Sequence, residues 1–422
     1  MLPYDRRPLS TPPQHRVCIL GLGRVGYPLA ISMADAGLDV LGVDIDLAHI
    51  HALRKGSCFS REPQLLERAH HLLEQGRIEL SDKPTEDTSL LIVAVPFESY
   101  TQLEALLDAH LPYMADDGVI IIESTCGLGW TRRAQQHLVS RRADQSLCAL
   151  VYMPERLMPG RALEELATLD RVFASTSSRA LEIAERVYSH ITTGSLAAVS
   201  YEEAELIKLT ENAQRALNIA FVNEIANLST RHGARYQTVL EQARKHPRVT
   251  LPEPGLGAWG GCLPFALDQL AEHGLLTMRA ASKSNNLQPS LCAEMVIDAL
   301  REIDNPSVLI LGRSYKANIA DDNNAPGELI AAIIRERSPH VQLTIFDPYF
   351  SASQQREPAK PLFEGHHVCV IATKHDEFTR IERSSLMCME PPRIVFDFFD
   401  TIAFESDHCI QIIERSSMLE LI

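Results

Sequence analysis

A glycine-rich turn near the start of the chain constrains the fold more than any other feature. The run Gly21-Leu22-Gly23-Arg24-Val25-Gly26 directly follows an apolar segment at 16–20 and directly precedes a helix-like segment, YPLAISMADAG. Glycines permit a tight turn and let a pyrophosphate approach a helix N-terminus, where free N–H groups favour an anion. Asp44 ends the next apolar segment, about 20 residues on, where a carboxylate binds ribose hydroxyls and would repel a 2′-phosphate. The sequence therefore predicts a dinucleotide-binding domain that takes NAD.

The order of apolar segments extends this prediction to the whole chain. Short runs rich in β-branched residues alternate with helix-length amphipathic stretches, at 16–20, 39–43, 90–95, 118–122 and 148–152, and again at 307–312, 341–346, 367–373 and 393–398. Residues 201–231 instead predict one long helix, of the kind that links domains or dimerises. We expect an α/β protein with two Rossmann-like parallel-sheet domains, joined by a long central helix in an all-helical dimerisation region. The expected divisions are 1–199, 200–295 and 296–422.

Composition narrows the class of ligand. The 422 residues carry a formal charge of −15, which disfavours nucleic acid or an anionic membrane surface as the main partner and leaves a small molecule. The first 15 residues lack the apolar core of a signal peptide, and no apolar run approaches the ~18 residues of a membrane span, so we expect a cytoplasmic protein. Nine cysteines without CxxC pairs fit reduced thiols better than disulfides or zinc, and we expect no metal site.

Cys262 has a setting that no other cysteine here shares. It ends the glycine-rich run Pro254-Gly255-Leu256-Gly257-Ala258-Trp259-Gly260-Gly261, in which the backbone can pass close to a ligand. A thiol placed there could attack a substrate carbon. The alternative is a small residue buried in a tight turn, which is how most such cysteines behave.

Three polar groups suggest a ligand site, and each has an alternative interpretation. Glu123-Ser124-Thr125 follows a predicted strand and could also cap a helix. Glu155 and Arg156 lie in a loop after another strand, where they could be merely solvated. Lys208, Asn212 and Arg215 share one face of the long helix, which is either its wet side or a place where an oxyanion is stabilised.

Taken together, these motifs resemble the UDP-glucose/GDP-mannose dehydrogenase family, in particular the subgroup that acts on UDP-N-acetylmannosamine or UDP-N-acetylglucosamine. The matching segments run in order along almost the whole chain. They are GLGRVGYPLA at 21–30, EST at 123–125, PERLMPG at 154–160, ELIKLTENAQRALNIAFVNE at 205–224, HPRV at 246–249, GGC at 260–262, YKAN at 315–318, FDPY at 346–349 and ATKHDEF at 372–378.

The resemblance implies an enzyme that oxidises the C6 alcohol of a nucleotide sugar to a carboxylate with two NAD in succession. In such a reaction Cys262 adds to the aldehyde to give a thiohemiacetal, and further oxidation gives a thioester that water hydrolyses. Lys208 and Asn212 would stabilise the oxyanions, and Glu155 and Thr125 would position or activate water.

The resemblance also implies a set of binding residues and a homodimer through the long helix. Pro96 and Thr125 would contact NAD beside the glycine turn and Asp44, and the HPRV arginine would reach the neighbouring subunit's site. The residues expected to bind the nucleotide sugar are Glu155, Arg156, Leu157, Lys208, Asn212, Arg215, His246, Arg248, Gly257, Tyr315 and Lys316. A role in making surface polysaccharide or a glycosylated metabolite is the corresponding expectation.

Several positions depart from the family pattern. The aspartate usual four residues after the cysteine is Ala266 here, and a small loop insertion could let Asp268 replace it. Trp259 stands where a glycine is usual, and Asn323 where an arginine is usual. Phe97 replaces a threonine. His49 also replaces a lysine or arginine, and the late Asp-x-Arg-Asn signature reads Asp397-Phe398-Phe399-Asp400.

Three hypotheses follow from the matches and departures. The first is an NAD-dependent 6-dehydrogenase of a nucleotide sugar. The second is a single oxidation of a different nucleotide-linked alcohol, because the usual aspartate is missing. The third is a non-catalytic relative that binds nucleotides, which would gain support if Trp259 or Phe97 filled the cofactor or sugar space.

Overall fold

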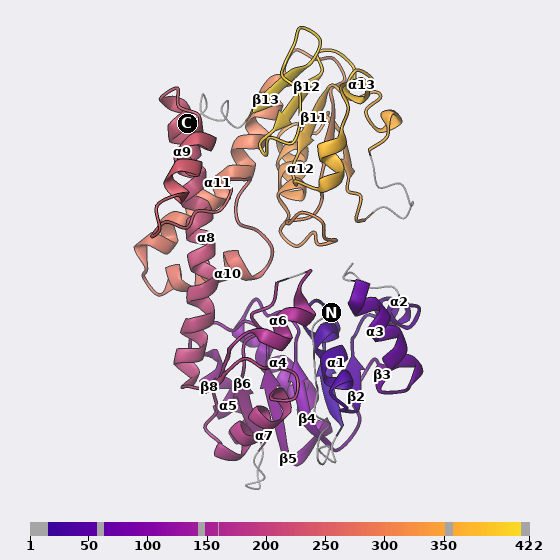
Figure 1. Ribbon diagram of the computed structural model, residues 1–422, viewed down its shortest axis with the longest axis vertical. Coiled ribbons are helices and arrows are strands. Elements are labelled where there is room, and N and C mark those ends of the chain that lie inside the picture. The colour runs from indigo at the N-terminus through magenta and orange to yellow at the C-terminus, as the bar shows by residue number, and fades with distance from the viewer. Residues whose placement is uncertain (1–15, 57–62, 142–147, 159, 351–357, 415–422) are drawn as a thin grey trace. The chain divides into compact units, whose positions relative to one another are not determined.

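The computed structural model describes residues 16–56, 63–141, 148–158, 160–350 and 358–414, and its contacts divide the chain into two units. The first unit runs to Thr210 and the second begins at Glu211, within one continuous helix (Figure 1). Residues 1–15, on which the expected absence of a signal peptide rests, and Pro159 of the PERLMPG motif lie outside the described residues. Within the described part of the chain, no helix combines the length and the apolar character needed to cross a bilayer.

The first unit is built on a six-stranded parallel sheet in the order β3-β2-β1-β4-β5-β6. Its strands are β1 (Val17–Leu20), β2 (Val40–Val43), β3 (Ile78–Ser81), β4 (Thr88–Val93), β5 (Met114–Ile122) and β6 (Ala149–Tyr152). Five of them confirm the predicted strands. The sixth, β3, was not predicted, because this edge strand alternates buried with more exposed residues over only four positions.

Helices and a small second sheet complete the first unit. The helices are α1 (Gly26–Asp35), α2 (Leu47–Arg54), α3 (Pro63–Glu74), α4 (Tyr100–His110), α5 (Trp130–Arg141), α6 (Ala162–Thr168) and α7 (Ser178–Tyr188), with a 3₁₀ turn η1 (Leu111–Tyr113). Strands β7 (Arg171–Phe173) and β8 (Leu196–Ala198) pair in parallel beside them and were not predicted. Leu29 and Ile31 of α1 share one buried cluster with Val17 and Ile19 of β1, so both the sheet and the turn before α1 are anchored in the core.

One helix of 31 residues, α8 (Tyr201–Arg231), confirms the predicted long helix. It is followed by α9 (Tyr236–Arg244), α10 (Cys262–Glu272) and α11 (Leu276–Ala299). The boundary between the two units falls inside α8, whereas the divisions expected at 199/200 and 295/296 stay predictions.

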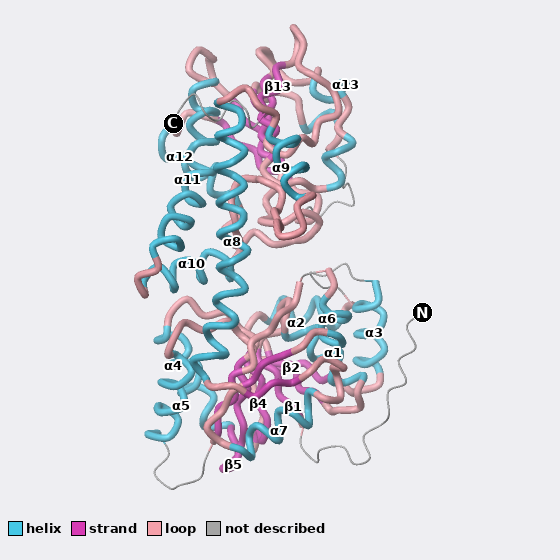
Figure 2. Tube along the Cα trace, turned by 60° about the vertical axis from the view of Figure 1, so that its left-hand side comes forward, coloured by secondary structure: helices cyan, strands magenta, loops and turns pink. Residues whose placement is uncertain are grey.

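The second unit carries a five-stranded parallel sheet in the order β10-β9-β11-β12-β13, and Figure 2 shows it as a group of strands flanked by helices. Its strands are β9 (Ser307–Leu311), β10 (Gln342–Phe346), β11 (Val368–Ile371), β12 (Ile394–Asp397) and β13 (Gln411–Glu414), with helices α12 (Pro326–Arg337) and α13 (Arg383–Leu386) and 3₁₀ turns η2 (Lys360–Leu362) and η3 (Asp376–Arg380). The first four strands confirm the prediction, and β13 was missed.

The two sheets share one turn geometry after β1 and β9. Gly21 N donates to Val43 O at 2.8 Å, and Gly312 N donates to Phe346 O at the same distance. A Cβ on Gly26 would overlap the carbonyl oxygen of Gly21, and a Cβ on Gly327 would overlap that of Gly312. Four residues separate the glycines in the first turn and fourteen in the second, so the second turn carries an additional loop.

Candidate active site

The glycine turn after β1 has the shape that a dinucleotide requires. Gly21 has φ +83°, and a Cβ there would lie 2.6 Å from Val95 Cγ1, so this position needs glycine. Nothing lies within 4 Å of a Cβ built on Gly23, which leaves its surface open for a phosphate. Within the described residues, α1 has no side-chain cap and no acidic residue in its first turn, so its N-terminal N–H groups suit an anion. These features fit the pyrophosphate of NAD.

The Asp44 carboxylate at the end of β2 is held by two backbone N–H groups. Its Oδ2 accepts a hydrogen bond from Leu22 N at 2.9 Å, and its Oδ1 accepts one from Asp46 N at 3.0 Å. The residue is half-exposed, so lone pairs remain for ribose hydroxyls. Pro96 is exposed after β4, whereas Phe97 is only 6% exposed, so the Phe97 ring is packed inside and does not project into solvent at this edge.

Glu123 at the end of β5 anchors the neighbouring loops. Its Oε1 accepts hydrogen bonds from Arg171 Nη1 at 2.9 Å and from Tyr188 OH at 2.5 Å. Burial raises the pKa of Glu123, and the charge of Arg171 and the Tyr188 hydroxyl oppose that rise. Because Glu155 N donates to Glu123 O at 3.0 Å, this buried group also holds the start of the loop that carries Glu155.

The alternative interpretation of Ser124 and Thr125 as a helix cap is wrong. Helix α5 begins only at Trp130, and Glu205 of α8 accepts from the N–H groups at its start, from Gly129 at 2.6 Å and from Thr131 at 2.8 Å. Thr125 is half-exposed in the loop after β5. The start of α5 is thus capped by Glu205 of α8, and not by Ser124 or Thr125.

Glu155 and Lys208 form a buried ion pair. Lys208 Nζ lies 3.1 Å from Glu155 Oε1 and also donates to the carbonyl oxygen of Glu155. The Lys208 side chain is 4% exposed and that of Glu155 is 11% exposed, so neither is a solvated surface group. Leu157 N donates to the second oxygen of the carboxylate at 2.6 Å, while half-exposed Arg156 donates to Asp170 O at 2.8 Å.

Asn212 follows Lys208 by one turn of α8 and is fully buried. Its Oδ1 accepts a hydrogen bond from Arg215 Nη2 at 2.7 Å. This bond fixes the orientation of the amide group and leaves Nδ2 as its donor. That Nδ2 has no hydrogen-bond partner among the residues the structure describes. The alternative of a wet helix side is therefore wrong for Lys208 and Asn212, and a buried donor of this kind calls for an acceptor.

In the second unit, buried amides shape the glycine-rich loop before Cys262. Asn285 of α11 accepts from Ala258 N and donates to Ala258 O at 3.0 Å, so it pairs with one residue of the loop as a strand would. Asn223 of α8 accepts from Gly255 N at 2.8 Å. The loop is therefore held at two points by helices of the central region.

Trp259 is folded back onto this same loop. Its Nε1 donates to Leu256 O at 2.6 Å, and the indole lies 2.6 Å from where a Cβ on Gly257 would stand. Asn285 Oδ1 is 2.7 Å from that position, so Gly257 is covered on this side by two side chains. The bulk of Trp259 is thus packed within the loop.

Cys262 is exposed and is the first residue of α10. A helix N-terminus favours an anion, and the thiolate is the nucleophilic form of cysteine. By contrast, burial raises the pKa of Cys18 to about 12 and that of Cys126 well above its usual value. The alternative of a buried structural cysteine is wrong for Cys262.

Asp268 does not take the place of the missing aspartate. Helix α10 runs unbroken from Cys262 to Glu272, so no loop insertion shifts the register, and Ala266 one turn after Cys262 is fully buried. Six residues on a helix rotate a side chain by about 240°, which turns Asp268 away from Cys262. It accepts instead from Ser282 Oγ of α11 at 2.7 Å.

The loop after β9 packs against the cysteine loop within the second unit. A Cβ on Gly260 would lie 3.0 Å from Cε2 of Tyr315, and one on Gly261 would lie 3.1 Å from Asn323 Nδ2. Lys316 is half-buried next to Tyr315. Tyr315 and Asn323 thus lie beside the residues that lead into Cys262, which suits substrate binding there.

His246 and Arg248 lie apart in an exposed turn after α9. Arg248 N donates to His246 Nδ1 at 3.4 Å, and Arg248 Nη2 lies 3.3 Å from His246 Nε2. Their predicted contact with a substrate, or with a second subunit, stays a prediction. Sequence reasoning missed Glu205, Asn223 and Asn285 as supports of the site, because each bonds to backbone 27 or more positions away and leaves no local pattern.

The sequence profiles of one family match all three parts of the chain. The UDP-glucose/GDP-mannose dehydrogenase family, NAD binding domain, matches residues 15–192, the family's central domain matches 202–286, and its UDP binding domain matches 309–403. A UDP-N-acetyl-D-mannosamine dehydrogenase of Pyrococcus horikoshii is 30% identical over 400 residues, which are 90% of this chain and 94% of that protein. An NDP-N-acetyl-D-galactosaminuronic acid dehydrogenase of Ralstonia solanacearum is 26% identical over 407 residues, 90% of this chain and 95% of the relative.

Solved structures give the same result. The UDP-D-ManNAc dehydrogenase from Pyrococcus horikoshii superposes with a TM-score of 0.84 at 28% identity and covers 96% of this chain and all of that one. The native UDP-N-acetyl-mannosamine dehydrogenase from Staphylococcus aureus superposes with a TM-score of 0.82 at 25% identity over 96% of this chain and 99% of that one. The resemblance inferred from the motifs is confirmed.

Two glycines of the first turn should respond differently to the same added methyl group. Gly26→Ala is expected to lower the free energy of unfolding by about 2–3 kcal/mol, because the Cβ overlaps the Gly21 carbonyl. Gly23→Ala should change stability by less than about 0.5 kcal/mol yet weaken NAD binding roughly tenfold or more, because its methyl would stand where a pyrophosphate approaches. Urea unfolding and calorimetric titration with NAD measure both quantities. Unchanged NAD affinity in Gly23→Ala would show that the cofactor binds elsewhere.

Proposed function

Because this chain belongs to the UDP-glucose/GDP-mannose dehydrogenase family, we propose that it oxidises the C6 alcohol of a UDP-N-acetylhexosamine, or of a related nucleotide sugar, to a carboxylate through a thioester on Cys262. It is an NAD-dependent nucleotide-sugar dehydrogenase at the level of the family. The names of the relatives, which are dehydrogenases of N-acetylated nucleotide sugars, support this substrate class.

The observation that carries the proposal is the pair of buried donors on α8. Lys208 presents a buried ammonium, and Asn212 one turn later presents a buried N–H donor that has no partner in the described part of the chain. A buried donor without an acceptor, as in Asn212, is costly in a folded protein. Lys208, paired with Glu155, adds a fixed positive charge one helical turn away. An oxyanion would supply the acceptor for Asn212 and would be stabilised by both groups, because fixed donors aimed at developing charge lower the barrier of acyl chemistry.

In the proposed reaction Cys262 forms and breaks the covalent bond. Its thiolate adds to the C6 aldehyde, the C–S bond forms, and Lys208 and Asn212 donate hydrogen bonds to the resulting oxyanion. NAD, when bound, would supply the oxidising power by taking a hydride from the sugar carbon in each oxidation, and the hydroxyl proton of the first oxidation would pass to water. Water then attacks the thioester, Glu155 takes up its proton, Thr125 orients it, and the C–S bond breaks with the thiolate as leaving group. The aldehyde thus stays attached to the protein until it is oxidised.

The two glycine turns assign the cofactor to the first unit. There Gly23 is open and Asp44 half-exposed, as a dinucleotide requires. In the second unit Ser314 follows the turn glycine at the position of Gly23, and Asp347 is buried at the position of Asp44. The second unit therefore suits the nucleotide of the sugar substrate.

A single oxidation is the second candidate, and the surroundings of Cys262 favour it. The position one turn along α10 is a buried alanine, and Asp268 is bonded to Ser282 on another side of the helix. A thioester formed on Cys262 would then lack the carboxylate that is usual in the family four residues after the cysteine. The non-catalytic relative is the third candidate: Phe97 is buried, whereas Trp259 covers one side of Gly257, a residue expected to bind the sugar.

The number of NADH formed per sugar distinguishes these candidates. The protein is mixed with excess NAD and a limiting amount of UDP-N-acetylmannosamine, UDP-N-acetylglucosamine, UDP-N-acetylgalactosamine, UDP-glucose or GDP-mannose, and NADH is followed by absorbance. We expect two NADH per sugar with one of the N-acetylated substrates, and a uronate as the product detected by mass spectrometry. One NADH with a released aldehyde would support the single oxidation. No NADH with any sugar, while UDP and NAD still bind, would refute both.

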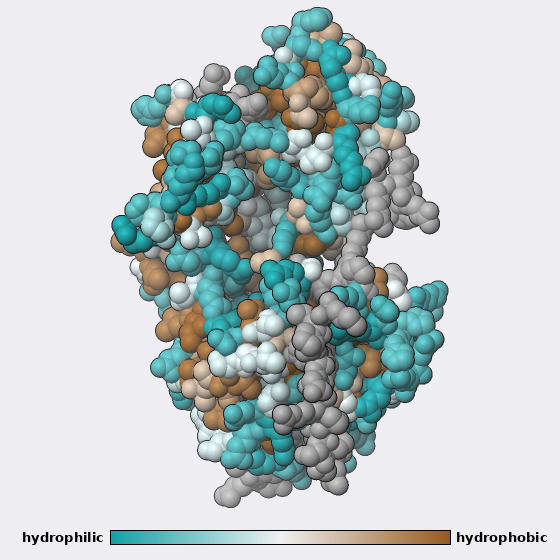
Figure 3. Space-filling view, viewed as in Figure 1, coloured by the Kyte–Doolittle hydropathy of each residue, from teal (hydrophilic) through white to brown (hydrophobic). Residues whose placement is uncertain are grey.

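A homodimer through the central helix is the second part of the proposal. Phe221 and Leu228 of α8 are 49% and 50% exposed, and seven residues place them on one side of the helix. Figure 3 shows further hydrophobic atoms at the surface where α10 and α11 lie, and Leu276, the first residue of α11, is 76% exposed. Apolar side chains exposed along one helical region are typical of an interface. Arg248, in its exposed turn, would then reach the partner's site.

Phe221→Asp is expected to convert a dimer into a monomer, because it introduces a charge beside Leu228 on the exposed apolar side of α8. The molar mass measured by light scattering should fall from twice 47.0 kDa to that of one chain. Leu47→Asp is the control, since Leu47 is 65% exposed on α2 of the first unit. A wild-type protein of single-chain mass, or an unchanged mass in Phe221→Asp, would refute a dimer through α8.

A further inference from the structure

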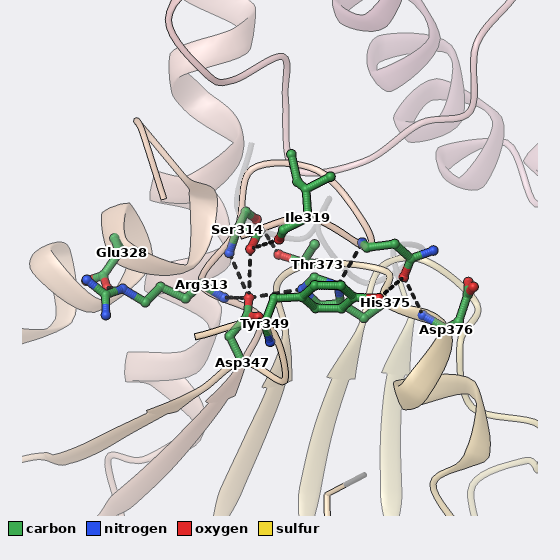
Figure 4. A network of polar contacts seen from close by, with 10 residues as sticks. Arg313, Ser314, Ile319, Glu328, Asp347, Tyr349, Thr373, His375 and Asp376 are labelled. Atoms are coloured by element: carbon green, nitrogen blue, oxygen red, sulfur yellow. Dashed lines mark hydrogen bonds and ion pairs between the residues drawn. The ribbon is translucent and has the colours of Figure 1, made fainter. Parts of the chain in front are cut away.

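The loop at 313–325, which follows β9, is held down by a buried polar network at the carboxyl edge of the second sheet (Figure 4). It replaces the short glycine turn of the first unit and carries Tyr315 and Lys316. Thr373 Oγ1 donates to Ser314 O at 2.6 Å, and Ser314 Oγ donates to Ile319 O at 2.6 Å. The loop is therefore tied both to its own backbone and to the segment after β11.

At the base of this network Asp347 is buried, and its Oδ2 is occupied by protein donors. Its Oδ2 accepts from Arg313 N at 2.7 Å, from Ser314 N at 3.0 Å and from His375 Nε2 at 3.0 Å, while its Oδ1 accepts from Tyr349 N at 2.8 Å. Asp347 is 5% exposed and His375 is fully buried. The equivalent Asp44 accepts two backbone hydrogen bonds and is half-exposed. In the second unit an imidazole thus bonds to the carboxylate that corresponds in position to Asp44.

The other nitrogen of His375 holds the loop. Because Nε2 donates to the carboxylate, Nδ1 is the acceptor, and Asn318 N donates to it at 2.9 Å. Tyr349 stacks on the imidazole with ring centroids 4.9 Å apart, which fixes the plane of the ring. Asn318 is bound a second time, since its Oδ1 accepts from Asp376 N at 3.1 Å.

The loop that contains Asn318 contacts the cysteine loop directly. Tyr315 N donates to Asp321 O at 2.8 Å, so the residues around Asn318 form one closed turn. The Tyr315 ring lies against Gly260, 3.0 Å from where a Cβ would stand, and Asn324 Nδ2 donates to Gly260 O at 3.4 Å. A shift at Asn318 therefore moves groups that lie two residues before Cys262.

We propose that His375 is a positioning residue for the nucleotide sugar, which holds the 313–325 loop through Asn318. The inference rests on the proposed function, in which Tyr315 and Lys316 contact the substrate. It assigns the shape of the substrate loop to one buried imidazole.

Two substitutions separate the two hydrogen bonds of His375. His375→Asn can place an amide oxygen where Nδ1 stood, so it keeps an acceptor for Asn318 N and loses the bond to Asp347. His375→Gln can place an amide nitrogen where Nε2 stood, so it keeps the bond to Asp347 and leaves Asn318 N without its acceptor. Each removes one hydrogen bond from the same buried ring, so their melting temperatures should fall alike.

Calorimetric titration with UDP and with NAD is the readout, and the KM values for nucleotide sugar and NAD are measured beside it. We expect His375→Gln to raise the Kd for UDP on the order of tenfold and His375→Asn to change it by about twofold at most. The Kd for NAD should stay at the wild-type value in both. Equal loss of UDP affinity in both variants, wild-type UDP affinity in His375→Gln, or an equal loss of NAD affinity would overturn the proposal.

Binding also separates this inference from the proposed reaction. Selective loss of UDP affinity in His375→Gln supports the inference even if wild-type protein oxidises no sugar, whereas a wild-type protein that does not bind UDP refutes it. Asn318→Gly is a second variant should either histidine variant fail to fold, because Asn318 is exposed with φ 63°, where glycine is unstrained. It removes the bond to Asp376 and should weaken UDP binding in the same direction, and unchanged binding would count against the proposal.

Discussion

The structure depends on one uninterrupted helix that supplies buried polar side chains to the functional loops. From α8, Glu205 binds the N–H groups that open α5, Lys208 binds the carboxylate and carbonyl of Glu155, and Asn223 binds Gly255 of the cysteine loop. Each of these loops lacks regular secondary structure and would otherwise leave its backbone groups unsatisfied. A break in α8 would release all of them, which is why a helix without proline at this place matters to function.

Charge is also buried along this helix, at a cost to the fold. Taking the Lys208 ammonium out of water is costly, and removal of one partner from such a buried pair costs roughly 3–5 kcal/mol. Apolar residues of the same size would have been less costly for the fold. In the proposed reaction the pair and the neighbouring Asn212 donor serve as preorganised electrostatics for the oxyanion.

Local patterns in the sequence predicted most helices and strands, but they could not predict hydrogen bonds between residues that are far apart in the sequence. The glycine turn with Asp44 and the long helix are encoded within short windows, so both were correctly predicted. The partner of Lys208 lies 53 positions away, and the amide of Asn285 binds a loop 27 positions away, so neither bond leaves a local signal. Asp268 is close to Cys262 in sequence, but the rotation of successive residues along α10 turns its side chain away from Cys262. Strands β7 and β8 were missed because each has only three residues, and β3 and β13 are short strands at the edges of their sheets.

The central claim is that Cys262, exposed at the start of α10, bonds covalently to the sugar between the two oxidations. Replacing it by serine tests this most directly, with Cys409→Ser, a half-exposed thiol in the second unit, as the matched control. The product of each variant is identified after incubation with NAD and the preferred nucleotide sugar. Cys262→Ser is expected to yield no uronate and at most one NADH per sugar, while Cys409→Ser should behave as the wild type. Uronate formed by Cys262→Ser at the wild-type rate would contradict a covalent role for Cys262.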